Sequence, residues 1–349
     1  MSPTPGEIGA GPTRGQAGVS PTPVATPSGG QATLVLLPPQ RASAAGWAER
    51  LMKDVPGLTV LSPDEPHVAD ALRTADAAYG ALPPELLAVT TRLRWLQAPQ
   101  AGPPPGFYYP ELVAHPVQVT NMRATYTDHV AEHTLALILA LTRAIPRYVQ
   151  DQQQAAWNPD WDPTSVLPLS EATALVIGVG AVGAEVGRLL AAFGSQVIGV
   201  DARRSEAPGF AEVLPVEALD EQLPAADLVI LTVPHTPDTE GMVDRRFLQR
   251  CKRSALFVNV GRGPTVRLDD LDAALAAGEL RGAALDVFEI EPLPAEHPLW
   301  HRPGVLLTPH VAGAGPHTDE RRYAVLAENC RRFVAGQELI NVVDKTKWF

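Results

Sequence analysis

The stretch Leu175-Val-Ile-Gly178-Val-Gly180-Ala181-Val-Gly183 constrains the fold of this chain more than any other feature. It places a GxGxxG pattern directly after an apolar strand and directly before a helix. Gly178 permits a tight turn, Gly180 lets the backbone approach a pyrophosphate, and Gly183 lets helix and strand pack closely. Ala181 lies in the same loop and is counted with these cofactor-binding residues. Because helix amides also attract anions, the pattern predicts a dinucleotide-binding βαβ unit.

The second strand of that unit ends in an acidic residue. Asp201 follows the apolar run 196–200 and stands eighteen residues after Gly183, where a carboxylate can accept a hydrogen bond from a ribose 2′-hydroxyl. A carboxylate there would repel a 2′-phosphate, which favours NAD over NADP. Arg203 and Arg204 follow at once and could tolerate the phosphate, so the use of NADP stays open. A strand–turn–helix that binds no ligand is disfavoured, because Asp201 stands at the distance from the glycines that the dinucleotide-binding pattern requires.

Three polar residues follow apolar strands in the second half of the chain. Arg262, Glu291 and His310 each stand just past the carboxyl end of a predicted strand, where open α/β sheets bind ligands. The cation could hold a carboxylate, the imidazole could move a proton, and the carboxylate could orient the imidazole. Each residue alone could be a surface charge at a loop mouth. All three beside a dinucleotide motif predict an active site.

Alternating strand and helix patterns divide the chain into two parallel α/β units. Short elements alternate over residues 31–127, and a longer strand–helix rhythm follows over 128–317. A last helix, expected at 319–334, should fold back onto the first unit, so residues 318–349 are assigned with it. Residues 1–30 hold six Pro and seven Gly but no Leu and no aromatic residue, which predicts a disordered tail.

Strands and helices are expected at defined places in both units. The predicted strands are 34–37, 58–61, 77–79, 93–97 and 117–120, then 174–178, 196–200, 228–233, 255–260, 282–287 and 305–307. The predicted helices outside the last one are 42–53, 68–75, 127–146 and 182–193. The helix at 127–146 is apolar on every side over 135–141, so it should be buried against the other domain or another subunit. Pro146 is expected to limit its end.

Composition excludes several classes of protein. The formal net charge of -11 argues against broad binding to nucleic acid or to anionic membranes. The longest apolar run, 135–141, is far shorter than the roughly 18 residues that span a bilayer. Cys251 and Cys330 are isolated in sequence, which suggests neither a disulfide framework nor a zinc site and fits a reducing cytosol. A cytoplasmic protein is therefore expected.

Several motifs together resemble the D-isomer-specific 2-hydroxyacid dehydrogenase family, over about residues 93–343. The matching stretches are the GxGxxG loop, Val130-Ala-Glu-His-Thr-Leu-Ala-Leu-Ile-Leu-Ala-Leu141, Thr232-Val-Pro-His-Thr-Pro-Asp-Thr239, Val258-Asn-Val-Gly-Arg-Gly263, Leu285-Asp-Val-Phe-Glu-Ile-Glu-Pro-Leu293, Leu307-Thr-Pro-His-Val-Ala-Gly313 and residues 328–344. The resemblance implies an α/β fold of two Rossmann-like domains, a flavodoxin-like substrate domain and a doubly wound parallel sheet that binds NAD. It also implies a cleft between the domains, and a homodimer.

The resemblance assigns a role to each candidate residue. Arg262 is expected to bind the carboxylate and keto oxygen of the substrate, His310 to be the acid/base on the 2-oxygen, and Glu291 to hydrogen-bond to His310. Ala101 and Gly102 resemble the loop that holds the substrate carboxylate. The remaining residues that resemble cofactor-binding positions are Val182, Val233, Pro234, Thr239, Val260 and Asp286.

This chain departs from the family pattern in the substrate loop and at Gly261, and Glu291 bears on the choice of substrate. The substrate loop usually continues from Gly into an apolar residue and an Asp, whereas here it runs Gly102-Pro103-Pro104-Pro105. Gly261 stands where the family usually has Ala, which is expected to be a small backbone change. Glu291 stands where formate dehydrogenases have Gln, which argues against formate and for a 2-keto acid.

A zinc site is weighed and set aside. His129-Val-Ala-Glu132-His133 matches the HxxEH pattern of inverted zinc peptidases. The same stretch has a non-metal place in the family pattern, so no metal is expected.

The predicted function is an NAD(P)-dependent reductase that interconverts a small 2-keto acid, such as glyoxylate or hydroxypyruvate, and its D-2-hydroxy acid. The alternative is a dinucleotide-sensing interaction protein on the same fold, with incidental turnover.

Overall fold

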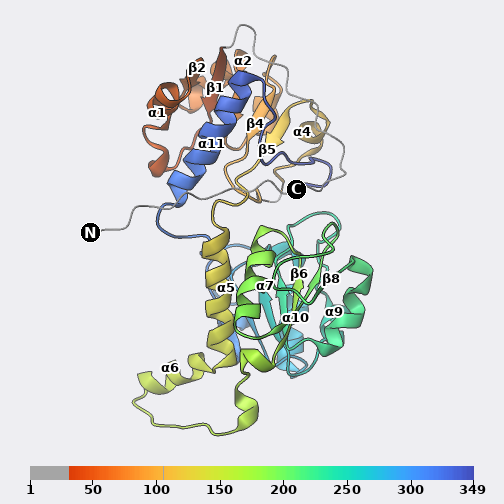
Figure 1. Ribbon diagram of the computed structural model, residues 1–349. Coiled ribbons are helices and arrows are strands. Elements are labelled where there is room, and N and C mark those ends of the chain that lie inside the picture. Colours follow the sequence, from red (N-terminus) through yellow and green to blue (C-terminus); the bar gives the residue numbers. More distant parts are fainter. Residues whose placement is uncertain (1–30, 105) are drawn as a thin grey trace, which may run out of the picture.

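The computed structural model describes residues 31–104 and 106–349, and the tail predicted at 1–30 lies outside the described residues. Figure 1 shows two bodies, each built on its own sheet, with the chain crossing between them. Both sheets are parallel throughout, which confirms the prediction of an α/β fold with two Rossmann-like domains. Parallel strands need crossover connections, and the alternating helices supply them.

The first sheet has five strands in the order β2-β1-β3-β4-β5. Its strands are β1 (Ala32–Leu36), β2 (Leu58–Leu61), β3 (Ala77–Tyr79), β4 (Trp95–Gln97) and β5 (Gln118–Thr120). The helices of this body are α1 (Trp47–Asp54), α2 (Val68–Arg73), α3 (Pro84–Leu87), α4 (Pro110–Ala114) and α11 (Thr318–Ala335). The central strands β3 and β4 are buried at every residue, as parallel strands covered on both faces should be.

The second sheet has seven strands in the order β12-β11-β10-β9-β6-β7-β8. Its strands are β6 (Thr173–Ile177), β7 (Gln196–Val200), β8 (Glu212–Leu214), β9 (Leu228–Leu231), β10 (Leu256–Asn259), β11 (Gly282–Leu285) and β12 (Val305–Leu307). The helices of this body are α5 (Thr127–Thr142), α6 (Ile145–Gln153), α7 (Ala181–Ala192), α8 (Leu219–Gln222), α9 (Arg245–Arg250) and α10 (Leu268–Ala276). The strand order reverses between β6 and β9, which opens a crevice at their carboxyl ends.

The helix predicted at 127–146 is wrong in its extent. α5 ends at Thr142, Ala144 adopts a left-handed backbone with φ 55°, and α6 begins at Ile145. Pro146 starts the new helix instead of ending the old one, because a proline in the first turn lacks only an amide that would be unpaired anyway. Figure 1 shows α6 projecting away from both sheets.

α5 is buried along one side only. Val130, Leu137 and Ile138 are among its buried residues, in the same cluster as buried residues of β10 and β11. Ala136 is exposed, and Leu135 and Leu139 are half-buried. One side of this apolar helix therefore faces away from the packed core.

α11 closes the first body from the far end of the chain. Its buried residues Leu326, Cys330 and Phe333 pack in one cluster with Trp47 of α1 and Trp95 of β4. The ring centroids of Trp95 and Phe333 lie 5.3 Å apart. Figure 1 shows this helix lying along the first body beside α1. The chain therefore crosses between the two bodies at the starts of α5 and α11.

Candidate active site

The GxGxxG loop lies in the crevice where the strand order reverses. Gly178 has φ 91°, in the left-handed region that favours glycine. A Cβ at Gly183 would lie 2.0 Å from the Gly178 carbonyl oxygen, so only glycine fits that packing. A Cβ at Gly180 would meet nothing within 4 Å, and no side chain caps the amides of α7. Open space before uncapped helix amides fits the pyrophosphate of a dinucleotide.

Asp201 stands at the end of β7, but its carboxylate is used by the protein itself. Oδ2 accepts from the Val179 amide at 2.7 Å, and Oδ1 accepts from the amides of Arg203 and Arg204 at 2.8 and 2.9 Å. These bonds offset part of the negative charge with backbone dipoles. The side chain links the loops that follow the neighbouring strands β6 and β7.

The segment after β9 forms a locked turn beside the GxGxxG loop. The Thr239 hydroxyl donates to the Pro234 carbonyl at 2.7 Å and accepts from the Thr236 amide at 2.8 Å. Val233 packs against the Gly178 turn, since its Cγ1 would lie 2.9 Å from a Cβ there. Val182 and Val260 line the same edge as half-buried and buried residues respectively.

Arg262 reaches from the end of β10 toward the other body. Its Nη2 donates to the Gly102 carbonyl at 2.8 Å, and its Nη1 donates to the Gly261 carbonyl at 2.6 Å. Burial lowers the pKa of the guanidinium, although Tyr126 and Glu291 act in the opposite sense. An arginine keeps its charge even so. A half-buried cation held at the boundary of two domains can attract an anionic ligand.

Residues that sequence reasoning missed hold Arg262 in place. Asn259 Oδ1 accepts from the Gly261 amide at 3.0 Å, and Asn259 Nδ2 donates to the Arg262 carbonyl at 3.2 Å. Thr265 also donates to that carbonyl. Glycine at 261 is more than a small change in this chain, because a Cβ there would lie 2.6 Å from the Val233 carbonyl oxygen.

His310 and Glu291 form a direct pair. His310 Nδ1 lies 2.7 Å from Glu291 Oε2, and the other carboxylate oxygen accepts from the Phe288 amide at 3.0 Å. The His310 backbone has φ 53°, and its amide donates to the Asp286 carbonyl at 2.8 Å. The His310 side chain is 48% exposed, so the imidazole is open to solvent. A carboxylate that fixes one ring nitrogen leaves the other for proton transfer.

Asp286 supports the His310 loop. Its carboxylate is 1% exposed and accepts from the Thr308 hydroxyl at 2.6 Å and from the Val311 and Ala312 amides at 2.9 Å. Thr308 in turn lies 2.9 Å from His133 Nε2. Every recorded bond of this carboxylate is to the protein. Neither Thr308 nor His133 was singled out from the sequence as a supporting residue, although both lie in matching motifs.

The loop at Ala101 and Gly102 is held by two side chains that were not predicted as site residues. The Ala101 amide donates to the Tyr126 hydroxyl at 3.0 Å, and Asn121 Nδ2 donates to the Ala101 carbonyl at 2.8 Å. A Cβ at Gly102 would lie 2.1 Å from Arg262 Nη2, so a glycine is needed for the arginine to approach. This loop and Arg262 therefore meet across the cleft.

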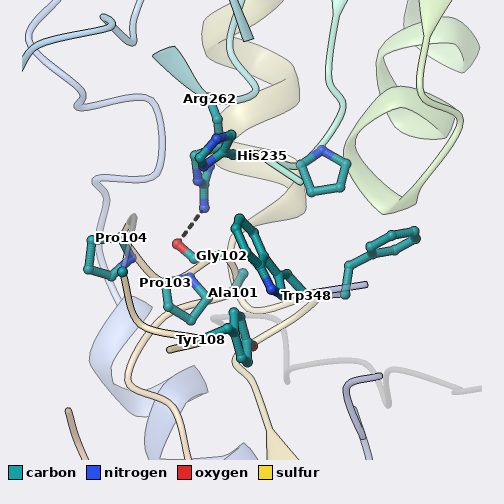
Figure 2. A pocket seen from close by; sticks show the side chains of 11 residues that line it. Ala101, Gly102, Pro103, Pro104, Tyr108, His235, Arg262 and Trp348 are labelled. Atoms are coloured by element: carbon teal, nitrogen blue, oxygen red, sulfur yellow. Dashed lines mark hydrogen bonds between the residues drawn. The ribbon is translucent and has the colours of Figure 1, made fainter. Parts of the chain in front are cut away.

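A small cavity of about 50 Å³ lies beside this contact. Figure 2 shows Arg262 reaching toward Gly102, with Tyr108 and Trp348 on the other side of the cavity. His235, from the segment after β9, also lines the cavity. Among the three residues that follow strand ends, Arg262 lines this cavity. His310 and Glu291 form their pair outside the cavity.

The HxxEH stretch at the start of α5 is used for packing. His133 contacts Thr308, and the ring of His129 would lie 2.5 Å from a Cβ at Gly315. Across residues 31–104 and 106–349, no group of three or more His, Cys, Asp or Glu side chains is placed to hold a metal ion. Over the same ranges, no helix combines the length and apolar character needed to cross a membrane.

Comparison with known proteins identifies the family. The family model described as "D-isomer specific 2-hydroxyacid dehydrogenase, NAD binding domain" matches residues 135–312. A glyoxylate reductase of Korarchaeum cryptofilum is 34% identical over 233 residues, which are 66% of this chain and 70% of that protein.

Two solved structures are similar over most of the chain. One is a D-isomer specific 2-hydroxyacid dehydrogenase from Xanthobacter autotrophicus, in complex with NADPH and MES, with a TM-score of 0.77, 29% identity, and coverage of 91% of this chain and 100% of that one. The other is an NADPH-dependent glyoxylate/hydroxypyruvate reductase from Sinorhizobium meliloti, with a TM-score of 0.77, 26% identity and the same coverage. With the paired parallel sheets and the GxGxxG crevice, these matches show that the chain belongs to the D-isomer specific 2-hydroxyacid dehydrogenase family.

Proposed function

We propose that this protein reduces a small 2-keto acid to the D-2-hydroxy acid, with glyoxylate and hydroxypyruvate as the first substrates to test. The observation that carries the proposal is the 2.7 Å pair of His310, which follows β12, and Glu291, which follows β11, together with the half-buried Arg262 at the end of the neighbouring β10. Relatives named as glyoxylate or hydroxypyruvate reductases support this choice of substrate. The domain assignment proposed is 31–127 with 318–349 for substrate and 128–317 for the dinucleotide.

Each residue has a defined task in the proposed reaction. The bound nicotinamide supplies the hydride to the keto carbon. Arg262 binds the substrate carboxylate and stabilises the negative charge that develops on the keto oxygen. His310 donates a proton from Nε2 to that oxygen, and Glu291 holds the ring in the orientation that this transfer needs. The reaction then balances as keto acid, reduced dinucleotide and one proton giving hydroxy acid and oxidised dinucleotide.

The dinucleotide site is proposed at the crevice between β6 and β9. The residues assigned to it are Gly178, Gly180, Ala181, Val182, Gly183, Asp201, Val233, Pro234, Thr239, Val260 and Asp286. Gly180 has the open space and the uncapped amides that a pyrophosphate needs. The assignment covers NAD and NADP together, since Asp201 favours the first by charge and the adjacent Arg203 and Arg204 favour the second.

A His310→Gln variant tests the proposed chemistry. Glutamine keeps a polar side chain of similar reach but cannot donate a proton as an acid, so we expect turnover to fall by roughly 10²–10⁴-fold. Binding of the reduced dinucleotide should stay unchanged, as measured by isothermal titration calorimetry. Wild-type protein that reduces no member of a broad 2-keto-acid panel would favour the alternative, a dinucleotide-sensing interaction protein.

We also propose that the protein is a cytoplasmic homodimer. The α6 segment and the loop after it carry Trp157 and Trp161, which are 93% and 88% exposed, and Ile145 and Val149 are exposed on α6 itself. Clustered exposed apolar side chains of this size are typical of a protein interface. The half-buried side of α5 adjoins this segment. Two buried free thiols, Cys251 and Cys330, fit a reducing compartment.

A further inference from the structure

Residues 344–349 form a turn, the terminal turn, that is fixed to the first body. The Val343 amide just before it donates to the Val119 carbonyl at 2.9 Å, and Lys345 Nζ donates to the Leu112 carbonyl at 3.0 Å. A backbone hydrogen bond of 3.2 Å between the first and last residues of the turn holds it closed. The turn therefore belongs to the first body as a formed unit.

The terminal turn carries two aromatic rings across to the second body. The Trp348 ring stacks on Tyr108 of the first body at a centroid distance of 6.3 Å and meets His235 of the second body edge-on at 5.7 Å. Figure 2 shows the Trp348 ring between Tyr108 and His235. The centroid of the Phe349 ring lies 3.7 Å from the guanidinium carbon of Arg203, which follows β7. Both rings therefore bridge the two bodies.

The contacts on the second body adjoin the proposed dinucleotide site. His235 directly follows Pro234, and Arg203 stands two residues after Asp201. Pro234 and Asp201 are both assigned to that site. The terminal turn therefore reaches from the first body to the edge of the proposed dinucleotide crevice.

The same two rings close the space beside Arg262. Trp348 and Phe349 line the cavity of about 50 Å³ together with Arg262. Sites that hold small molecules and cofactors enclose roughly 300–1,000 Å³. With the turn in this position, the space beside Arg262 is too small for a nicotinamide and a 2-keto acid together. The turn has to move before both can occupy the cleft.

The contacts of the terminal turn with the second body are of a kind that can be released. Within residues 31–104 and 106–349, the two ring contacts are recorded between them but no hydrogen bond or ion pair. Burial lowers the pKa of Arg203, and the charge of Asp344 in the turn acts in the opposite sense. Trp348 has φ 64°, a left-handed backbone that is costly for a bulky residue. Strained segments of this kind are found at switches.

We propose that the terminal turn is an autoinhibitory strap: its rings hold the two bodies together over the cleft and have to release before dinucleotide and substrate enter. The inference rests on the proposed function, because it takes the crevice and Arg262 as the binding sites. Binding that waits for such a release is slower than binding to an open site.

Stopped-flow mixing with NADPH and with NADH measures how fast the strap lets nucleotide enter. Trp348→Ala removes the ring contacts to Tyr108 and His235, so both association rate constants should rise about two- to tenfold, the range expected for an aromatic pair. Trp348→Phe keeps a ring at the same place and should stay close to wild type. Phe349→Ala should raise both rate constants about two- to fivefold, because a cation–π contact is lost.

Phe193→Ala is the control, because it removes the same side chain as Phe349→Ala at a site that follows α7 and is 46% exposed. It should leave both rate constants unchanged. Unchanged or slower association in Trp348→Ala would overturn the inference, since the turn would then not block entry. Faster dissociation with unchanged association would also overturn it, since the turn would then retain bound nucleotide instead.

Small-angle X-ray scattering without nucleotide tests the strap independently of the proposed function. The double variant Trp348→Ala with Phe349→Ala should have a larger radius of gyration than wild type, because the two bodies separate more easily. A protein that binds neither nucleotide would overturn the proposed function, and the scattering comparison would then decide on the strap. Equal radii of gyration would overturn the strap itself.

Discussion

Glycines set how closely the polar groups of the cleft approach one another. A Cβ at Gly263 would lie 1.7 Å from the Phe288 carbonyl oxygen, because the residue after Arg262 packs directly on the strand end that leads to Glu291. A Cβ at Gly180 would meet nothing within 4 Å. Identical substitutions at the two positions therefore probe packing in one case and access for a ligand in the other.

Gly263→Ala should destabilise the protein by roughly 1–3 kcal/mol, because the added methyl group forces backbone apart in a packed region. Gly180→Ala should leave the free energy of unfolding within about 0.5 kcal/mol of wild type but weaken dinucleotide binding. Urea unfolding and calorimetric titration measure the two effects. Equal stability of Gly263→Ala and wild type would contradict the packing described here.

At the scale of single residues, the charged residues of the candidate site could be predicted from the sequence. The residues that hold them in place could not. Arg262 and the His310–Glu291 pair were predicted because charged side chains after apolar strands are conspicuous. Tyr126 accepts from the Ala101 amide 25 residues away, and a polar residue that bonds to distant backbone has no local sequence pattern. The bond from the Val179 amide to Asp201 was missed for the same reason.

At the scale of elements, the long periodic segments were predicted best. The strands from β1 to β12 other than β8 were expected within a few residues, since each is an apolar run of the usual length. β8 was missed because its three residues, Glu212–Leu214, carry a charge and no apolar run. The break between α5 and α6 was missed because it falls at Ala144, whose left-handed backbone no signal in the sequence indicates.

The crossing helices α5 and α11 are joined by an ion pair. Arg321 Nη1 lies 2.6 Å from Asp128 Oδ1 and 3.3 Å from the Thr125 carbonyl oxygen. The hydrogen bond from Arg321 lowers the pKa of the Asp128 carboxyl below its ordinary 3.8. A carboxyl whose folded pKa is depressed contributes stability above its unfolded pKa and loses it as the pH falls through the folded pKa.

Arg321→Gln should therefore lower the free energy of unfolding at pH 7 by less than about 1 kcal/mol, since both side chains are over a third exposed. The difference from wild type should vanish as the pH falls below 3.8 toward the folded pKa of Asp128. Denaturant titrations at pH 7, 5 and 3 measure it, with Arg253→Gln as the charge control. A difference that stays constant with pH would show that Arg321 acts through packing alone.

At the scale of the whole molecule, the two bodies meet through few segments. Within residues 31–104 and 106–349 the chain crosses at α5, α11 and their flanking loops, and the terminal turn with Trp348 and Phe349 and the Arg262–Gly102 bond add further contacts. The α6 segment projects from the opposite end (Figure 1), where it can meet a second copy without closing the cleft. Such a separation would allow domain motion within each subunit of the proposed dimer.

The double substitution Trp157→Ser and Trp161→Ser should convert the proposed dimer to a folded monomer, because it removes the largest exposed apolar surfaces of the α6 segment. Light scattering coupled to size-exclusion chromatography measures the mass, and circular dichroism checks the fold. Val216→Ser, at a site also 47% exposed, is the matched control and should stay dimeric. A double variant that remains a dimer would place the interface elsewhere.

The 2.8 Å bond from Arg262 to the Gly102 carbonyl has a consequence for affinity. It joins the two sides of the cleft, so a carboxylate that binds Arg262 would replace a contact within the protein with one of its own. The apparent dissociation constant then equals the intrinsic constant divided by the fraction of molecules in which that internal contact is open. Changes far from the cleft that favour the open form would tighten substrate binding without altering any group that touches the substrate.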